Sequence, residues 1–463
     1  MTSTTVLHAA CTVDGESVSL SLQEDGLVLE RGDALPTTIA WADVLGATAT
    51  ATMLTIHTCP RRGNGKRALR KLVAESDDMT LLAHVAVATT FLARFGWAPE
   101  RSLDDLLHAT PAPRKCLVLI NPVGGSGKSE AMFESVRGFF DATHIDVTTQ
   151  CTEYAGHATE IGRTLNLTAY DFMVCVGGDG LASEVVQGLM RRQDWHDAIR
   201  FPFGLIPGGS GNGLTQSLTK LLGEAFEPEN CAYLIVKGAP QPIDMMTARN
   251  AEQETFYSFL SLAWAFVADV DLESETYRFL GGARFTMASV AKVLSWKRWH
   301  GALSYLPLEA DESSDSAYWE SNPTPRGSAP ELHLLHDISA PVPTHWKTIE
   351  GPYSFFWATS AALPSSDCHL APGAHINDGL IHIVAAPKNL SMVAQTKLLL
   401  GLDTGAHIEY PFVQVIKTRA YQLRRTDTNY ISIDGERLGG ETIQVQMHKG
   451  LGRVMCLPLP AQS

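Results

Sequence analysis

Three apolar runs in the middle of the chain end abruptly in glycine-rich turns. The runs and the turns that follow them are Cys116–Ile120 before Asn121-Pro-Val-Gly-Gly-Ser-Gly, Phe172–Val176 before Gly177-Gly-Asp-Gly, and Phe203–Ile206 before Pro207-Gly-Gly-Ser-Gly-Asn. After the first turn, apolar residues recur at helical spacing, as at Met132, Val136 and Phe140. Three strand-turn-helix units so close together predict a parallel sheet with crossover helices.

The first hundred residues show the alternation that is typical of strands. Val18, Leu20 and Leu22 alternate with polar residues, and Met53–Ile56 is a further apolar run. A helical pattern follows over about 77–95. Strands capped by one helix resemble a pleckstrin-homology-like fold. Between strand and helix lie basic residues that either contact anionic lipid head groups or form a solvated loop, namely Arg61, Arg62, Lys66, Arg67, Arg70 and Lys71.

Short strand-like runs in the second half of the chain predict an antiparallel β-sandwich. These runs are Tyr353–Trp357, Leu380–Val384, Ala420–Leu423, Tyr430–Ile433 and Thr442–Met447. Before them, Asp311–Gly327 is rich in Ser, Asp, Glu and Pro, which predicts a mobile insertion. His369, His375 and His382 lie among the strands, and their spacing fits no metal site.

The predicted fold class is therefore α/β plus all-β. A chain of 463 residues has room for three domains. We place a strand-and-helix module over 1–108, an α/β nucleotide-binding domain with a parallel sheet over 109–250, and a β-sandwich domain over 251–463. The mobile insertion lies near 309–330, and the expected active site is the cleft between the last two domains.

The glycine-rich turns are suited to bind phosphate. Glycine lets the backbone approach phosphate oxygens, and the helix N-terminus that follows adds partial positive charge. The first turn is not a Walker A loop, because Pro122 stands where that motif requires glycine. The third turn lacks the dinucleotide-binding spacing. Any one turn could be a tight βα connection in which glycine supplies positive φ, but three together favour a nucleotide site.

Together these turns resemble the catalytic domain of the diacylglycerol-kinase-type lipid kinases. Within that superfamily, Gly180–Met190 and Ser261–Tyr277 are similar to sphingosine kinases. The resemblance covers about 114–300 and resumes from Leu370 to the C-terminus. It implies an enzyme that uses ATP and Mg²⁺ to phosphorylate the primary hydroxyl of sphingosine or a related sphingoid base.

The resemblance also implies roles for individual residues. Asp179 would act as general base and contact the substrate, with a structural Asx turn as the alternative. Arg278 and Arg284 would contact phosphate through their guanidinium forks, unless they are solvated surface charges. Asp434 would lie near magnesium, although Asp-Gly is also a strong hairpin signal. The other nucleotide-side positions are Asn121, Gly124, Gly125, Thr152, Gly177, Gly178, Glu184, Gly209, Ser210, Gly211 and Glu436.

Two of those positions, Thr152 and Glu184, could equally be helix-start residues. On the substrate side, Ser261 and Asp271 match the head-group positions of sphingosine kinases, and Asp269 would support them. A buried carboxylate needs a cation, and sphingosine carries an amine where ceramide and diacylglycerol are neutral. A salt bridge between Asp271 and Arg278 is the structural alternative.

The composition of the chain limits its possible binding partners and its location in the cell. A formal charge of −14 argues against general nucleic-acid binding, which needs basic stripes. The eight cysteines include no C-x-x-C pair, as expected of reduced thiols in a cytoplasmic protein. There is no signal-peptide pattern and no run of membrane-spanning length, so we expect peripheral association with membranes. Lys292–His300, with alternating tryptophans and cations, is either an interfacial segment or an ordinary helix end.

The sequence thus predicts an ATP-dependent sphingosine kinase. A ceramide or diacylglycerol kinase is the nearest alternative. An alternative of another class is a membrane-binding scaffold that has lost catalysis. The sequence leaves the oligomeric state open, a homodimer included, and does not determine the preferred chain length of the lipid or the regulation of the enzyme.

Overall fold

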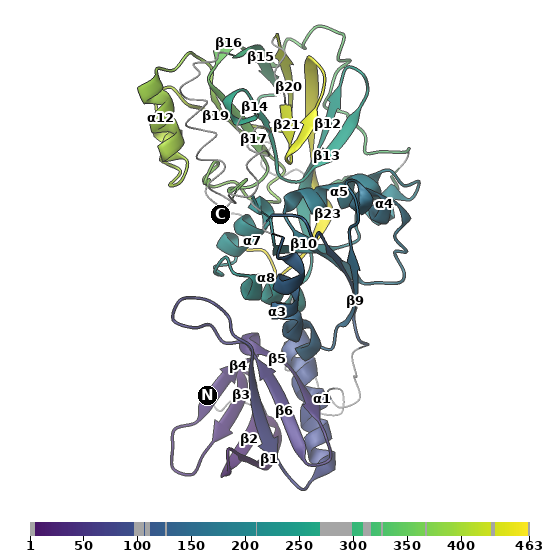
Figure 1. Ribbon diagram of the computed structural model, residues 1–463, viewed down its shortest axis with the longest axis vertical. Helices are drawn as coiled ribbons and strands as arrows, with labels where there is room; N and C mark the ends of the chain where they lie inside the picture. Colours follow the sequence, from purple (N-terminus) through teal and green to yellow (C-terminus); the bar gives the residue numbers. More distant parts are fainter. Residues whose placement is uncertain are drawn as a thin grey trace. The chain divides into compact units, whose positions relative to one another are not determined.

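A computed structural model describes most of the chain. The described residues are 5–96, 106, 112–125, 127–209, 211–268, 299–308, 316–325, 327–365, 368–426 and 431–461. They form two compact units, each assembled from segments that are distant in sequence (Figure 1). Unit 1 comprises Met1–Cys116, Met132–Thr148 and Glu224–Gly238, and unit 2 comprises Leu117–Ala131, Thr149–Gly223 and Ala239–Ser463. Among the helices of the described ranges, none has the length and hydropathy needed to cross a bilayer.

Unit 1 contains a seven-stranded antiparallel sheet with the order β4-β3-β2-β1-β7-β6-β5. The strands are β1 (Thr5–Val13), β2 (Glu16–Gln23), β3 (Gly26–Glu30), β4 (Thr37–Ala40), β5 (Val44–Ala49), β6 (Met53–Thr58) and β7 (Arg70–Glu75). Helix α1 (Met79–Phe95) begins at Asp78, whose carboxylate accepts a hydrogen bond from the backbone N–H of Leu81 at 2.9 Å. The alternating residues predicted as strands lie in β2 and β6, and their buried sides share a core with α1.

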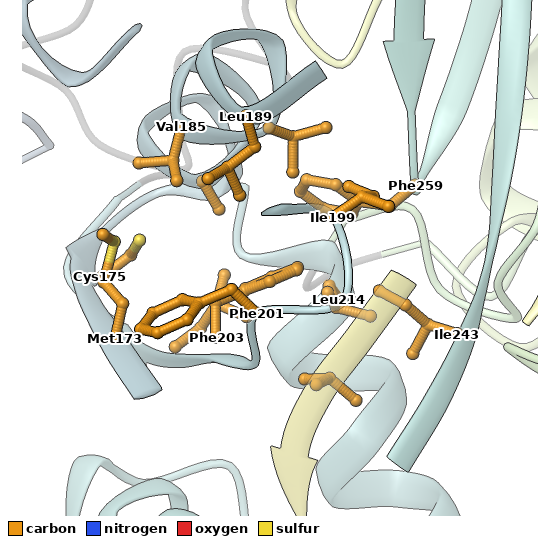
Figure 2. Close-up of a cluster of buried hydrophobic side chains, with 14 of the residues drawn as sticks. Met173, Cys175, Val185, Leu189, Ile199, Phe201, Phe203, Leu214, Ile243 and Phe259 are labelled. Atoms are coloured by element: carbon orange, nitrogen blue, oxygen red, sulfur yellow. The ribbon is translucent and has the colours of Figure 1, made fainter. Parts of the chain in front are cut away.

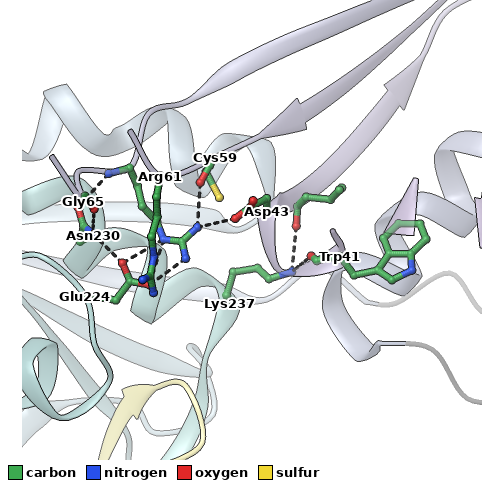
Figure 3. Close-up of polar contacts among 10 residues, drawn as sticks. Trp41, Asp43, Cys59, Arg61, Gly65, Glu224, Asn230 and Lys237 are labelled. Atoms are coloured by element: carbon green, nitrogen blue, oxygen red, sulfur yellow. Dashed lines mark hydrogen bonds and ion pairs between the residues drawn. The ribbon is translucent and has the colours of Figure 1, made fainter. Parts of the chain in front are cut away.

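Three of the six basic residues between β6 and α1, Arg61, Lys66 and Arg67, form ion pairs within unit 1 (Figure 3). The other three, Arg62, Arg70 and Lys71, are exposed. Arg67 is buried, and its guanidinium lies 2.8 Å from both Glu224 and Asp43. Arg61 also pairs with Glu224, and Lys66 pairs with Glu229 at 2.9 Å. Glu224 and Glu229 come from a segment more than 150 residues downstream, which sequence spacing does not reveal.

That segment includes α8 (Pro228–Lys237), which belongs to unit 1 by its contacts. The ammonium of Lys237 at its end donates to the backbone carbonyls of Trp41, Val44 and Ala93. Figure 3 shows the bond to Trp41. Burial lowers the pKa of Lys237 to about 8. Unit 1 is therefore held together by buried polar contacts as well as by its apolar core.

Unit 2 contains most of a ten-stranded mixed sheet with the order β16-β15-β20-β23-β11-β10-β8-β9, in which β12 and β13 extend from β23. Its strands are β8 (Lys115–Ile120), β9 (Asp146–Cys151), β10 (Phe172–Gly177), β11 (Phe203–Pro207), β12 (Ala239–Asn250), β13 (Thr255–Ser258), β15 (Trp299–Tyr305), β16 (Lys347–Tyr353), β20 (Ala420–Arg425) and β23 (Thr442–Cys456). Strands β10 and β11 are parallel, as predicted. The long β23 pairs with β11, β12 and β20, so one strand joins the parallel and antiparallel parts (Figure 1).

A second, six-stranded sheet completes the predicted sandwich. Its order is β19-β18-β17-β14-β21-β22, made of β14 (Ser261–Trp264), β17 (Phe355–Thr359), β18 (Ile381–Ala386), β19 (Gln414–Thr418), β21 (Ile431–Ile433) and β22 (Glu436–Leu438). Buried side chains from both sheets form one apolar cluster, to which β14 contributes Trp264 and β20 contributes Tyr421. Helix α12 (Met392–Gly401) follows β18.

Two predictions about this half of the chain are wrong in part. Of the expected interfacial segment or helix end, residues 292–298 lie outside the described ranges, and Trp299 is buried in β15. Within the segment expected to be mobile, Tyr318–Ser321 forms the short helix α11. The indole of Trp319 donates to the backbone carbonyl of Leu451 at 3.0 Å, so this part is a packed element.

The parallel part of the sheet packs against helices through a large buried cluster (Figure 2). Met173 and Cys175 of β10 face Val185 and Leu189 of α5 (Asp179–Met190), and Phe203 of β11 lies beside them. Helices α4 (His157–Thr164), α6 (Trp195–Ala198) and α7 (Gly213–Leu221) contribute buried residues to the same cluster. Helix α3 (Ser129–Ala142) belongs mostly to unit 1. This packing fixes the N-termini of α5 and α7 at the ends of β10 and β11, where the candidate site lies.

Candidate active site

The turns predicted from sequence meet at one edge of the sheet. The backbone N–H of Asn121, just after β8, donates to the carbonyl of Val176 at the end of β10 at 3.2 Å. Gly208, after β11, donates to Gly177 at 2.8 Å. Thr152, after β9, donates to Ile120 at 2.8 Å. Four neighbouring strands therefore end together, which is where α/β proteins bind ligands.

Glycine is required where these turns touch. A Cβ atom on Gly209 would lie 2.3 Å from the Cα of Gly178, and one on Gly125 would lie 2.1 Å from the carbonyl oxygen of Gly208. Gly125 also has a φ of 57°, in the left-handed region that favours glycine. The three turns are thus in direct backbone contact.

Asp179 is the first residue of α5, directly after the second turn. Its side chain is buried, and its carboxylate accepts hydrogen bonds from the N–H groups of Gly213 at 2.7 Å and Leu214 at 3.2 Å. These donors are the first residues of α7, so the acid lies at two helix N-termini. Burial nevertheless raises the pKa of Asp179 to about 6.

Asp434 is a second buried acid, in the hairpin turn between β21 and β22 that the sequence predicted. Its Oδ1 accepts hydrogen bonds from the hydroxyl of Ser258 at 2.7 Å and from the N–H of Ser261 at 2.9 Å. Burial raises its pKa to about 7, and the negative charge of Asp179 contributes to the rise. The two acids therefore lie within electrostatic range of each other, although more than 250 residues separate them.

The residues present fit a magnesium ion through Asp434. Its Oδ2 accepts one long hydrogen bond, from the N–H of Phe259 at 3.3 Å, and so retains ligand capacity. Within the described ranges no group of three or more His, Cys, Asp or Glu side chains could form a complete metal cage. Kinase magnesium sites ordinarily combine one or two carboxylates with substrate phosphates.

Two residues that position these acids had no role assigned from sequence. Asn212 accepts from the N–H of Gly209 at 3.1 Å and donates to its carbonyl at 2.7 Å, which ties the third turn to the start of α7. Ser258 holds Asp434. An asparagine directly before a helix is a recognisable capping signal, but the side chain of Asn212 bonds to Gly209 and makes no capping hydrogen bond. The contact between Ser258 and Asp434 joins distant segments, so a linear sequence does not reveal it.

The remaining predicted residues lie in different settings. Ser261 is buried in β14, and its carbonyl accepts from the N–H of Asp434 at 3.0 Å. The carboxylate of Glu184 accepts from backbone N–H groups at the start of α4, and burial raises its pKa. By these contacts, Glu184 caps the N-terminus of α4. Glu436 is exposed at the start of β22.

Some predicted site residues lie outside the described ranges. These are Ser210, Asp269, Asp271, Arg278 and Arg284. Within the described ranges, the site combines three touching glycine turns with Asp179, a buried carboxylate whose pKa burial raises to about 6. Such an arrangement can hold a phosphorylated ligand and remove a proton from a neighbouring hydroxyl.

Two family models match this architecture. Residues 115–248 match the diacylglycerol kinase catalytic domain, and residues 356–456 match the YegS C-terminal NAD kinase beta sandwich-like domain. A solved structure of a diacylglycerol kinase from Bacillus anthracis superposes with a TM-score of 0.51 at 16% identity, covering 75% of this chain and 99% of that one. This likeness confirms the fold of the two lobes.

Curated relatives are more similar in sequence. Sphingosine kinase 1 of Homo sapiens is 35% identical over 351 residues, which cover 73% of this chain and 90% of that protein. Sphingosine kinase 1 of Arabidopsis thaliana is 33% identical over 313 residues, covering 67% of this chain and 64% of the plant protein. The chain therefore belongs to the sphingosine kinase family, and its glycine turns, buried acids and two lobes agree with this.

Proposed function

We propose that this protein transfers the γ-phosphoryl group of ATP to the primary hydroxyl of a sphingoid base. The observation that carries the proposal is the setting of Asp179, a buried acid with a raised pKa where three glycine turns meet. A base works best when its pKa lies near the working pH. Family membership supplies the substrate class, because the similar proteins are named sphingosine kinases.

In the proposed step, the carboxylate of Asp179 accepts the proton of the lipid hydroxyl. The hydroxyl oxygen forms a bond to the γ-phosphorus, the bond from that phosphorus to the β,γ-bridging oxygen breaks, and ADP leaves with the bonding electrons. Positioning and charge neutralisation supply most of the catalysis in phosphoryl transfer. The backbone N–H groups of the turns after β8, β10 and β11 would hold the phosphates.

A magnesium ion, when bound, would neutralise charge on the nucleotide phosphates. Asp434 would hold it, with Ser258 and Ser261 fixing the carboxylate. Arg278 and Arg284 would add permanent positive charge at the phosphates. Asn121, Gly177, Gly211 and the other predicted nucleotide-side positions would contact the nucleotide. These assignments rest on the match to the family motif.

For the lipid, we assign Asp271 and Ser261 to the amine-bearing head group. An acid there would pair with the cationic amine of a sphingoid base and disfavour a neutral head group. Ser261 lies next to Asp434, which is itself close to Asp179, so a head group at Ser261 would be near the proposed base.

A lipid panel tests the proposed substrate. Purified protein with radiolabelled ATP is given sphingosine, ceramide and diacylglycerol side by side in mixed micelles. We expect phosphate transfer to sphingosine and at least about a hundredfold less to the two neutral lipids, a ratio typical of a site built around one polar group. Preference for ceramide or diacylglycerol would overturn the assignment of Asp271.

For the N-terminal region we propose a pleckstrin-homology-like module, with domains over 1–108, 109–250 and 251–463. Seven antiparallel strands in the order β4-β3-β2-β1-β7-β6-β5, followed by α1, support the module. We also propose that the enzyme meets its lipid at a membrane surface, since its substrate is membrane-bound. Vesicle co-sedimentation of the full chain would test that association.

A further inference from the structure

Unit 1 contains a pocket that the proposed kinase reaction does not use. Its volume is about 510 Å³, within the range of about 300–1,000 Å³ that holds drug-sized ligands. The wall comes from β5, α1, the residues that precede β8, the turn after α3, and the end of α8. Every lining residue of the described ranges belongs to unit 1, so the pocket is a property of this unit alone.

Small apolar residues form much of the wall. The alanines that line it are Ala47, Ala49, Ala83, Ala86, Ala93 and Ala112. Protein interiors are normally close-packed, so a cleft bordered by so many methyl groups is space that larger side chains could have filled. Among the described lining residues there is no phenylalanine, tyrosine or tryptophan on which a flat ring could stack. An extended alkyl chain fits these walls better than a nucleotide base.

The charged side chains among the described lining residues of the pocket are all basic. The charged lining side chains of the described ranges are Arg94, Arg114 and Lys237, and His144 lies on the same wall. Arg94 donates to the carbonyl of Ala112 at 3.0 Å, and Arg114 donates to the carbonyl of Gly238 at 3.3 Å. Lys237 is bound to three carbonyls. Backbone carbonyls orient these cations at the pocket, while none of its described lining residues is acidic.

We propose that this pocket binds a single-chain anionic amphiphile, an alkyl or acyl chain that ends in a carboxylate or a phosphate. The chain would lie along the alanines between β5 and α1. Its head group would lie at Arg94 and Arg114, whose guanidinium geometry suits both anions. The volume is sufficient for one ligand of this kind, and a second chain would require a larger cavity.

Displacement of a fluorescent fatty acid from the full-length protein tests the proposal. Competitors with the same sixteen-carbon chain are palmitate, hexadecyl phosphate, hexadecanol and hexadecyltrimethylammonium. We expect saturable binding of one probe per chain and displacement by the two anions at concentrations about tenfold or more below those of the neutral and cationic compounds. The stronger anion identifies whether a fatty acid or a phosphorylated lipid is the better ligand. Equal displacement by hexadecanol or the cation would overturn the proposal.

Variants locate the probe. Ala83→Phe fills the pocket from a position on α1 that is exposed, and should weaken binding about tenfold or more. Arg94 is also exposed, and Arg94→Glu replaces the positive charge at the head group with a negative charge without filling the pocket. It should weaken anion binding, and it tests the proposal independently if Ala83→Phe does not fold. Lys71→Met, an exposed basic residue of unit 1 outside the pocket, is the matched control and should change the affinity less than about twofold.

Asp179→Asn distinguishes this pocket from the kinase site. Probe binding should be unchanged in that variant, because Asp179 lies in unit 2. Loss of binding in Asp179→Asn, or full binding in both Ala83→Phe and Arg94→Glu, would place the probe elsewhere and contradict the proposal. Neither result depends on which lipid the enzyme phosphorylates.

Discussion

Unit 1 and unit 2 each bury carboxylates, but in opposite electrostatic settings. Glu224 of unit 1 is paired with Arg67 and Arg61 (Figure 3). Burial alone would raise its pKa, but the hydrogen bonds and charge of Arg67 outweigh that effect and hold the pKa below its ordinary value. In unit 2, Asp179 and Asp434 accept only uncharged N–H and O–H donors among the described hydrogen bonds, and burial raises both pKa values.

The two settings distinguish a carboxylate with a structural role, Glu224, from one that can react, Asp179. A carboxylate neutralised by two guanidinium groups stays ionised across the physiological range and cannot take up a proton there. A carboxylate held only by neutral donors in a buried site ionises near neutral pH and can exchange a proton with a bound hydroxyl. We therefore expect substitutions of Glu224 and Arg67 to alter the stability of the protein, and substitutions of Asp179 to alter its turnover.

The largest expected effect is on turnover in Asp179→Asn. Loss of a general base should lower kcat by about 10²–10⁴-fold, while the melting temperature stays close to that of the parent protein. The measurement is steady-state kinetics with sphingosine and ATP together with thermal unfolding. Unchanged kcat would assign Asp179 to a structural role at the start of α7. No measurable turnover in the parent protein would support the scaffold alternative.

Asp244 provides a matched control within unit 2. It is buried, accepts hydrogen bonds from the N–H groups of Gly379 at 2.6 Å and Gly450 at 2.7 Å, and burial raises its pKa well above the ordinary range. It thus shares the local bonding of Asp179 but not the glycine turns. Asp244→Asn should retain kcat, and an equal loss of kcat in both variants would mean that buried acids in this unit act only through folding.

The largest effect on stability is expected for Arg67→Met. The substitution leaves Glu224 buried with a weakened ion pair, which should lower the free energy of unfolding by about 3–5 kcal/mol. Chemical denaturation measures this loss, and kcat per folded molecule should be unchanged. Arg137→Met, at an exposed pair with Glu134, is the control and should cost less than about 0.5 kcal/mol. If Arg67→Met/Glu224→Leu fails to recover stability, the loss comes from packing against Tyr233 rather than from the unpaired acid.

A smaller, local effect is expected for Gly209→Ala. The new methyl group would lie 2.3 Å from the Cα of Gly178, so two phosphate-binding turns must separate. We expect the KM for ATP to rise about tenfold or more, with the KM for sphingosine little changed. Gly180→Ala, whose Cβ would have no neighbour within 4 Å, is the matched control. Equal kinetics for both variants would argue that the turns do not bind ATP.

The smallest effect is a difference in how stability changes with pH. The folded state lowers the pKa of Glu224, so its stabilising contribution is present above the ordinary pKa near 4.5 and is lost as pH falls below it. The folded state raises the pKa of Asp179 to about 6, so its ionisation removes stability as pH rises from about 4 to 6. The free energy of unfolding of Glu224→Gln minus that of the parent protein should be lower at pH 7 than at pH 3.5. For Asp179→Asn, the same difference from the parent should increase from pH 3.5 to pH 7. If the differences for both variants changed with pH in the same direction, the contrast between Glu224 and Asp179 would be refuted.

Local sequence signals predicted the elements and the site loops, because strands, glycine turns and the Asp-Gly hairpin are encoded by neighbouring residues. The parallel β10 and β11, the sandwich and the position of Asp179 follow from such signals. Contacts between distant segments were not predictable. The pairing of Arg67 with Glu224, the packing of Trp319, and the proximity of Asp434 to Asp179 depend on tertiary structure, which spacing along the chain does not specify.

The pH dependence of kcat/KM tests the central claim most directly, namely that burial without a cation sets Asp179 to ionise near neutral pH. At saturating magnesium, which would keep Asp434 ionised, we predict activity that rises with pH through an acidic limb with an apparent pKa of about 6, set by Asp179. In Asp179→Asn this limb should be absent from the residual activity. A parent limb near the ordinary carboxylate pKa of about 4 would contradict the claim.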